Sequence, residues 1–160
     1  MEHISVGIAD FKVIKGPAIL ETVGLGSCVC VILYDAITQI GGLAHIMLAD
    51  STVSQNKASP NKFADIGIRN MLKKMQEMGA LKRRMDAKII GGAGMFESTM
   101  YCDMMTIGEK NVKAVKKILA EEGILLKAED TGKSHGRTVE FRVETGKVIV
   151  KSAKFGVLEL

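Results

Sequence analysis

The segment Gly24-Leu25-Gly26-Ser27-Cys28 leads directly into Val29-Cys30-Val31-Ile32-Leu33-Tyr34, and this stretch decides the fold we expect. A run of apolar and β-branched residues without glycine or proline is typical of a buried strand. The glycines before it can adopt backbone angles closed to other residues, so we expect a tight loop that enters the strand. Cys28 is therefore predicted at a junction between loop and strand, where backbone N–H groups can turn toward a ligand.

Strands and helices are expected on both sides of this stretch. Alternation of apolar and polar residues predicts an opening strand over 4–8, and apolar runs predict strands over 18–22 and 40–48. The further elements expected along the chain are a long polar loop over 49–60, helices over 60–79 and 108–123, a strand over 87–90 and a closing hairpin over 138–151. This order predicts a fold that mixes helices with β-sheets.

Length and composition favour one globular domain over residues 1–160. A chain of 160 residues can bury a sizeable core, and 47% hydrophobic with 25% charged residues is typical of globular proteins. The first residues lack the basic and apolar regions of a signal peptide, and no run reaches the roughly 18 apolar residues of a membrane span. We therefore expect a cytoplasmic protein without membrane insertion.

Three cysteines are too few for a disulfide framework, and reduced thiols fit a cytoplasmic location. We expect Cys28 and Cys30 to point to opposite faces of their strand, which disfavours both a disulfide and a shared metal ion. A metal site formed by Cys28, Cys30 and His45 also lacks a second pair of ligands at the usual spacing. The glycine-rich turns could instead bind phosphate, but they match neither common phosphate-binding motif, so this signal is weak.

The net charge of +4 and the pI near 9.0 are a modest basic excess. Only 4% of the residues are aromatic, which disfavours base stacking, so no nucleic acid partner is expected. Lys82-Arg83-Arg84 and the lysines of the 108–123 segment have two readings. They form either a solvated surface or a docking site for an acidic partner.

Cys28 and His45 are the residues most suited to chemistry. A thiol acts as a nucleophile only as the thiolate, so a catalytic cysteine needs a nearby base. His45 lies in an apolar run where an unpaired imidazole would be costly, which suggests a neighbouring partner. Each residue also has a structural reading, since a cysteine in a strand is often a small core residue and a strand histidine often binds a backbone carbonyl.

Five motifs in order make the chain similar to a known family. They are Gly24–Val29, Gly42–Leu48, Ile90–Phe96, Ile107–Asn111 and Gly132–Arg137. Together they resemble the CheD family, the chemoreceptor glutamine deamidases of chemotaxis, and the similarity extends over nearly the whole chain.

The resemblance implies roles for particular residues. Cys28 corresponds to the nucleophile, His45 to the base and Thr22 to the residue that orients the imidazole. Backbone N–H groups around Ser27 and Cys28, with Gly26 lining the site, are candidates for oxyanion binding. The implied activity is that of a hydrolase, a protein-glutamine deamidase that converts receptor glutamine to glutamate through a thioester and needs no cofactor.

The family also implies a fold and partners. The expected fold is an α/β (α+β) single-domain sandwich of packed mixed β-sheets with helices on one side, similar to the catalytic domain of cytotoxic-necrotizing-factor toxins. The expected substrate is the cytoplasmic domain of chemoreceptors. A CheC-type phosphatase is an expected partner, and the alternative function is a non-catalytic module that binds this phosphatase and the receptors.

Overall fold

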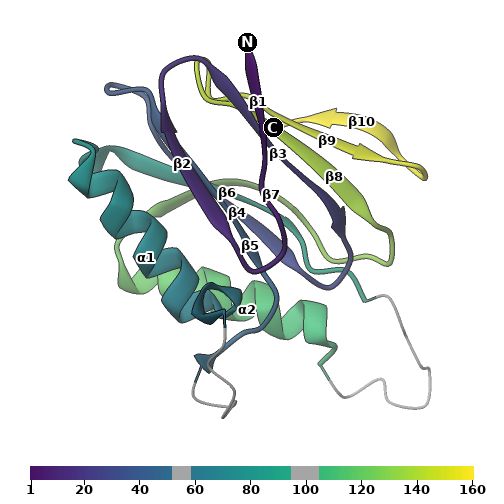
Figure 1. Cartoon of the computed structure of the whole chain (residues 1–160). Helices are drawn as coiled ribbons and strands as arrows, with labels where there is room; N and C mark the ends of the chain where they lie inside the picture. The colour runs from purple at the N-terminus through teal and green to yellow at the C-terminus, as the bar shows by residue number, and fades with distance from the viewer. Residues whose placement is uncertain (52–58, 95–104) are drawn as a thin grey trace.

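The computed structural model describes residues 1–51, 59–94 and 105–160, which form two five-stranded sheets and two α-helices (Figure 1). Sheet A has the strand order β1 (Glu2–Ser5), β3 (Ala18–Leu25), β8 (Arg137–Arg142), β9 (Val148–Ser152) and β10 (Gly156–Glu159). Sheet B has the order β2 (Phe11–Lys15), β5 (Ile40–Ile46), β4 (Val29–Asp35), β6 (Met85–Gly91) and β7 (Leu125–Thr131). Both sheets are mixed, because β1 pairs with β3 and β6 with β7 in parallel while the other pairs are antiparallel.

Sheet B lies between two apolar layers. One of its faces packs on sheet A, and the other is covered by α1 (Ala64–Glu77) and α2 (Ile107–Glu121), so both helices lie on one side of the sandwich (Figure 1). All seven residues of β4, between β5 and β6, are buried. A strand covered on both faces needs apolar side chains at successive positions, which explains the unbroken apolar run in the sequence. The expected layered fold with helices on one side is confirmed.

The element boundaries differ from the sequence prediction in several places. Pro60–Lys62 forms a short 3₁₀ turn, η2, and α1 begins only at Ala64. The strands β2, β7 and β10 were not predicted; each lies at the edge of its sheet and has no fully buried residue, so its apolar pattern is weak. The closing hairpin is confirmed as β8 paired with β9. Most of the polar loop predicted over 49–60 lies outside the described residues.

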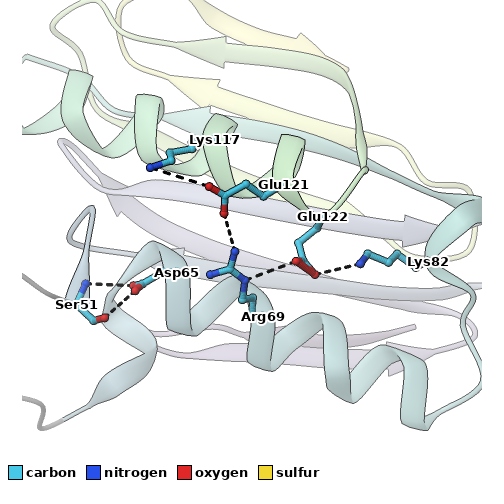
Figure 2. Close-up of polar contacts among 7 residues, drawn as sticks. All are labelled: Ser51, Asp65, Arg69, Lys82, Lys117, Glu121 and Glu122. Atoms are coloured by element: carbon cyan, nitrogen blue, oxygen red, sulfur yellow. Dashed lines mark hydrogen bonds and ion pairs between the residues drawn. The ribbon is translucent and has the colours of Figure 1, made fainter.

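A set of ion pairs joins the two helices on the surface. Arg69 of α1 reaches Glu121 at 2.7 Å and Glu122 at 3.6 Å at the end of α2 (Figure 2). Lys82, from the short 3₁₀ helix η3 (Lys82–Arg84), approaches Glu122 at 3.1 Å, and Lys117 lies 4.0 Å from Glu121. The basic groups considered as a docking site are therefore partly neutralised by acidic groups of the same chain.

Within the described ranges, neither helix has the length and apolar character needed to cross a membrane.

Two adjacent glycines in β5 allow close packing on both faces of sheet B. A Cβ on Gly41 would lie 2.6 Å from the ring of Phe141 in sheet A. A Cβ on Gly42 would lie 2.8 Å from the sulfur of Met71 in α1. An aromatic ring held between two sheets has little freedom to move, whereas a methionine side chain adapts easily.

We therefore expect Gly41→Ala to lower the free energy of unfolding by about 1–3 kcal/mol, the usual cost of overpacking a core. The matched change Gly42→Ala should cost clearly less, because Met71 can change rotamer. Urea denaturation followed by circular dichroism measures both. Equal losses in the two variants would contradict this account of the packing.

Candidate functional site

Cys28 lies half-buried at the entry to β4 and packs against the apolar layer between the sheets. Cys30 belongs to the same layer, and both thiols are free. The expectation that these two cysteines point to opposite faces is wrong, because residues two apart in a strand share a face. Cys28 therefore points toward sheet A.

Three successive carbonyl groups of the Cys28 loop accept hydrogen bonds from other parts of the chain. The carbonyl oxygens of Gly26 and Cys28 accept from the N–H groups of Ala93 and Gly92, at 2.9 and 2.8 Å. The carbonyl oxygen of Ser27 accepts from Nδ2 of Asn111 at 2.9 Å. The second glycine-rich turn of the sequence thus lies against the first, and the loop that carries Cys28 has a defined backbone.

Gly91 and Gly92 make this approach possible. Their φ angles are +112° and +67°, in the region that favours glycine. A Cβ on Gly91 would collide with the carbonyl oxygen of Cys28. These two positions therefore require glycine for both conformation and space.

His45 and Thr22 meet between the two sheets. His45 of β5 is 1% exposed, and its Nδ1 lies 2.8 Å from Oγ1 of Thr22 in β3. The Thr22 hydroxyl also lies 2.8 Å from the carbonyl oxygen of Val6. Since that carbonyl can only accept, the single hydroxyl hydrogen goes to Val6, and Thr22 must accept a hydrogen from Nδ1 of the imidazole.

This network assigns the tautomer of His45. With the hydrogen on Nδ1, the Nε2 atom of the neutral ring carries a lone pair. Nε2 is buried and has no hydrogen-bond partner among the described residues. Burial lowers the pKa of His45, which favours the same neutral ring. His45 is thus arranged to accept a proton at Nε2.

The strand register relates Cys28 to this ring. His45 lies directly opposite Cys30 in the β4–β5 ladder, so Cys28 is its diagonal neighbour on the same face of sheet B. Diagonal neighbours lie about 7–8 Å apart between backbone positions, within reach of long or aromatic side chains. Burial raises the pKa of the Cys28 thiol, and a hydrogen bond from its own backbone N–H partly opposes this rise. At neutral pH the pair is therefore an uncharged thiol beside an uncharged imidazole.

The predicted residues occupy one region of the sandwich, at the end of the strands where the Cys28 loop lies. Thr22 and His45 are in contact, Cys28 faces the same layer, and Gly26 and Ser27 form the half-buried loop beside it. The sequence prediction missed Asn111, although a buried amide in the otherwise apolar stripe of α2 was a signal for it. Among the residues that the structure describes, no group of three or more His, Cys, Asp or Glu side chains is placed to hold a metal ion.

A separate pocket of about 360 Å³ lies on the helix side of sheet B. Its lining residues come from α2 and from the ends of β6 and β7, and they are Gly92, Glu109, Val112, Lys113, Lys116, Thr131 and Gly132. None of them is Cys28, His45 or Thr22, although Gly92 also donates its N–H to the carbonyl oxygen of Cys28.

The chain matches a family model described as CheD chemotactic sensory transduction over residues 47–152. It is 49% identical to a protein of Clostridium novyi over 98% of this chain and 96% of that protein. The chain belongs to the CheD family. CheD proteins of Caldanaerobacter subterraneus and Clostridium botulinum are 47% and 48% identical over 96% and 100% of this chain, and over 95% and 99% of their own lengths. All three relatives are named probable chemoreceptor glutamine deamidase CheD.

Among solved structures, a protein of Bacillus licheniformis is similar to this CheD chain in fold. The hypothetical protein YfiH of Bacillus licheniformis aligns with a TM-score of 0.52 and 17% identity, over 78% of this chain and 51% of that protein. The CheD chain thus spans about half the length of YfiH. At this level of identity the likeness concerns the fold alone.

The direction of the pKa shift of Cys28 predicts how its thiol responds to alkylation. Because burial raises the pKa of the thiol, the rate of its reaction with iodoacetamide should keep rising with pH beyond about pH 8.5, the ordinary cysteine value. Alkylation at Cys28, located by peptide mass, measures this rate, with Cys28→Ala as the control. A plateau of fast alkylation from pH 6 upward would contradict the assignment, because it would indicate a preformed thiolate.

Proposed function

We propose that this protein hydrolyses the side-chain amide of specific chemoreceptor glutamines, releasing ammonia and leaving glutamate. The observation that carries the proposal is the bare Nε2 of His45, fixed by Thr22 on the face toward which Cys28 points. The names of the relatives support the choice of substrate. The reaction belongs to chemotaxis, and we place it in the cytoplasm, where the substrate domain of the receptors lies.

The first half of the reaction forms a thioester. Nε2 of His45 takes the proton of the Cys28 thiol as sulfur attacks the amide carbon, and the electrons of the C=O double bond move to oxygen. When this tetrahedral intermediate collapses, the C–N bond breaks and His45 returns the proton to the departing nitrogen. Ammonia leaves, and the glutamyl group remains bound to sulfur.

The second half consumes water. His45 is again neutral, so Nε2 can take a proton from a water molecule that attacks the thioester carbon. Collapse of the second intermediate breaks the C–S bond and yields the carboxyl group of glutamate, while the proton on His45 returns to the Cys28 sulfur. The sum is amide plus water to carboxylate plus ammonium, without an external oxidant or cofactor.

Both intermediates carry a negative oxygen that needs hydrogen-bond donors. The backbone N–H of Cys28 is the first candidate, since it belongs to the residue that carries the attacking sulfur. Ser27 and Gly26 supply the neighbouring peptide groups of the same loop. One such donor is worth about 10²–10³-fold in rate in other enzymes.

Replacing the nucleophile is the direct test of this mechanism. Cys28→Ala should abolish ammonia release from a purified chemoreceptor cytoplasmic domain and the accompanying Gln-to-Glu mass change. Removing one sulfur from a half-buried site should leave the fold intact, which circular dichroism checks. Cys30→Ala is the matched control, since Cys30 lies directly opposite His45 on the same face, and it should retain activity. Full activity of Cys28→Ala would refute the thiol mechanism and favour the alternative, a module that binds receptors and a CheC-type phosphatase.

The role of Thr22 predicts a smaller effect. Thr22→Val removes the acceptor for Nδ1 at nearly constant volume, and we expect the turnover number to fall by about 10–100-fold, as for other residues that orient a histidine. Thr22→Ser keeps the hydroxyl and should restore most of the rate. Because the buried ring has a lowered pKa, activity of the parent protein should persist below about pH 6.5. A Thr22→Val variant with the parental rate and pH profile would contradict the triad.

A further inference from the structure

The geometry points to Asn111 as a positioning residue that aims the backbone N–H of Cys28 at the oxyanion. We infer that its side-chain amide clamps the nucleophile loop to the strand that carries His45, and so keeps this N–H on the reacting side. The inference rests on the proposed function and adds to it a residue from α2, outside the triad.

The clamp is one amide group that serves two carbonyls. Nδ2 of Asn111 donates to the carbonyl oxygens of Ser27 and Met47, each at 2.9 Å. Ser27 precedes the nucleophile directly, and Met47 follows His45 by two residues. Both hydrogens of the amide are used where the β4–β5 ladder ends, between Val29 and Ile46. The side chain therefore holds together two segments that no strand pairing joins.

The clamp determines the orientation of the Cys28 peptide group. The C=O and N–H of a trans peptide point in opposite directions. Since the Ser27 carbonyl is directed at Asn111 on α2, the N–H of Cys28 points away from α2. The Cys28 side chain packs toward sheet A, on the face of sheet B opposite the helices. Sulfur and N–H thus lie on the same side of the loop, as an oxyanion donor requires.

The setting of Asn111 makes a purely structural role costly. Its side chain is 1% exposed, and its Oδ1 is buried without a partner among the described residues. An unsatisfied buried amide oxygen costs free energy, which an apolar residue at this position of α2 would avoid. Such a cost is typically retained where the polar group has a function.

Two measurements on Asn111→Ala test the inference. Deamidation depends on oxyanion stabilisation, whereas alkylation of Cys28 by iodoacetamide does not form an oxyanion. We expect kcat for receptor deamidation to fall by about 10²–10³-fold, the value of one oxyanion donor, with KM within about threefold of the parent. The alkylation rate of Cys28 should stay within about threefold. Asn111→Ser, which keeps one donor, should recover part of the lost kcat.

Lys88→Met is the matched control. Lys88 is also a buried donor to two carbonyl oxygens, those of Gly146 and Leu160, but it lies in the middle of β6, away from the Cys28 loop. This variant should lose stability in urea while keeping the parental kcat per folded molecule.

Failure of the inference about Asn111 can be distinguished from failure of the proposed function. Deamidation by Asn111→Ala within about threefold of the parent, or a parallel loss of alkylation and deamidation, would overturn the positioning role. An equal loss of kcat in Lys88→Met would also overturn it, since any buried polar deletion would then suffice. If instead Cys28→Ala retains activity, the proposed function itself has failed.

Discussion

The hydrogen bond between Thr22 and His45 crosses from sheet A to sheet B, and the chemistry of the site depends on it. It exists because the two sheets pack face to face and exclude water from the ring, which is 1% exposed. In water either ring nitrogen could carry the hydrogen. Between the sheets the Thr22 hydroxyl donates its hydrogen to the Val6 carbonyl, so it must accept a hydrogen from Nδ1 of His45. The lone pair of the imidazole is therefore on Nε2. The packing of the two sheets thus determines, through Thr22, which nitrogen of His45 can accept a proton.

Around this bond the structure holds Cys28, the proposed nucleophile, mainly through hydrogen bonds to its backbone. The carbonyl oxygens of Gly26 and Cys28 accept from Ala93 and Gly92, and that of Ser27 accepts from Asn111, so two segments of the chain fix the backbone of the Cys28 loop. Burial raises the pKa of the thiol and lowers the pKa of the imidazole, so both groups are uncharged at neutral pH, and in the proposed mechanism the proton moves only during the reaction. Such a site avoids holding a buried charge pair at rest, which would be costly without further partners.

The basic groups on the surface differ from the buried site in that many of them are exposed and form ion pairs. Several of the basic groups that the sequence offers as a docking surface are paired in the fold: Lys82 with Glu122, Arg84 with the buried Asp35, Lys116 with Glu129 and Lys117 with Glu121. The net charge of +4 is therefore partly offset by local pairing at these positions.

The sequence by itself determined the central buried strand, both helices, the closing hairpin and the family, because apolar periodicity and the glycine-rich motifs are local signals. It also pointed to Cys28 and His45 by residue type and position. That Cys28 and Cys30 share a face follows from the period of a strand, which the prediction misapplied. Only the tertiary structure decided that Thr22 fixes the tautomer of His45 and that Asn111 joins Ser27 to Met47. These facts depend on contacts between residues 23, 64 and 84 positions apart, and spacing along the chain carries no information on such distances.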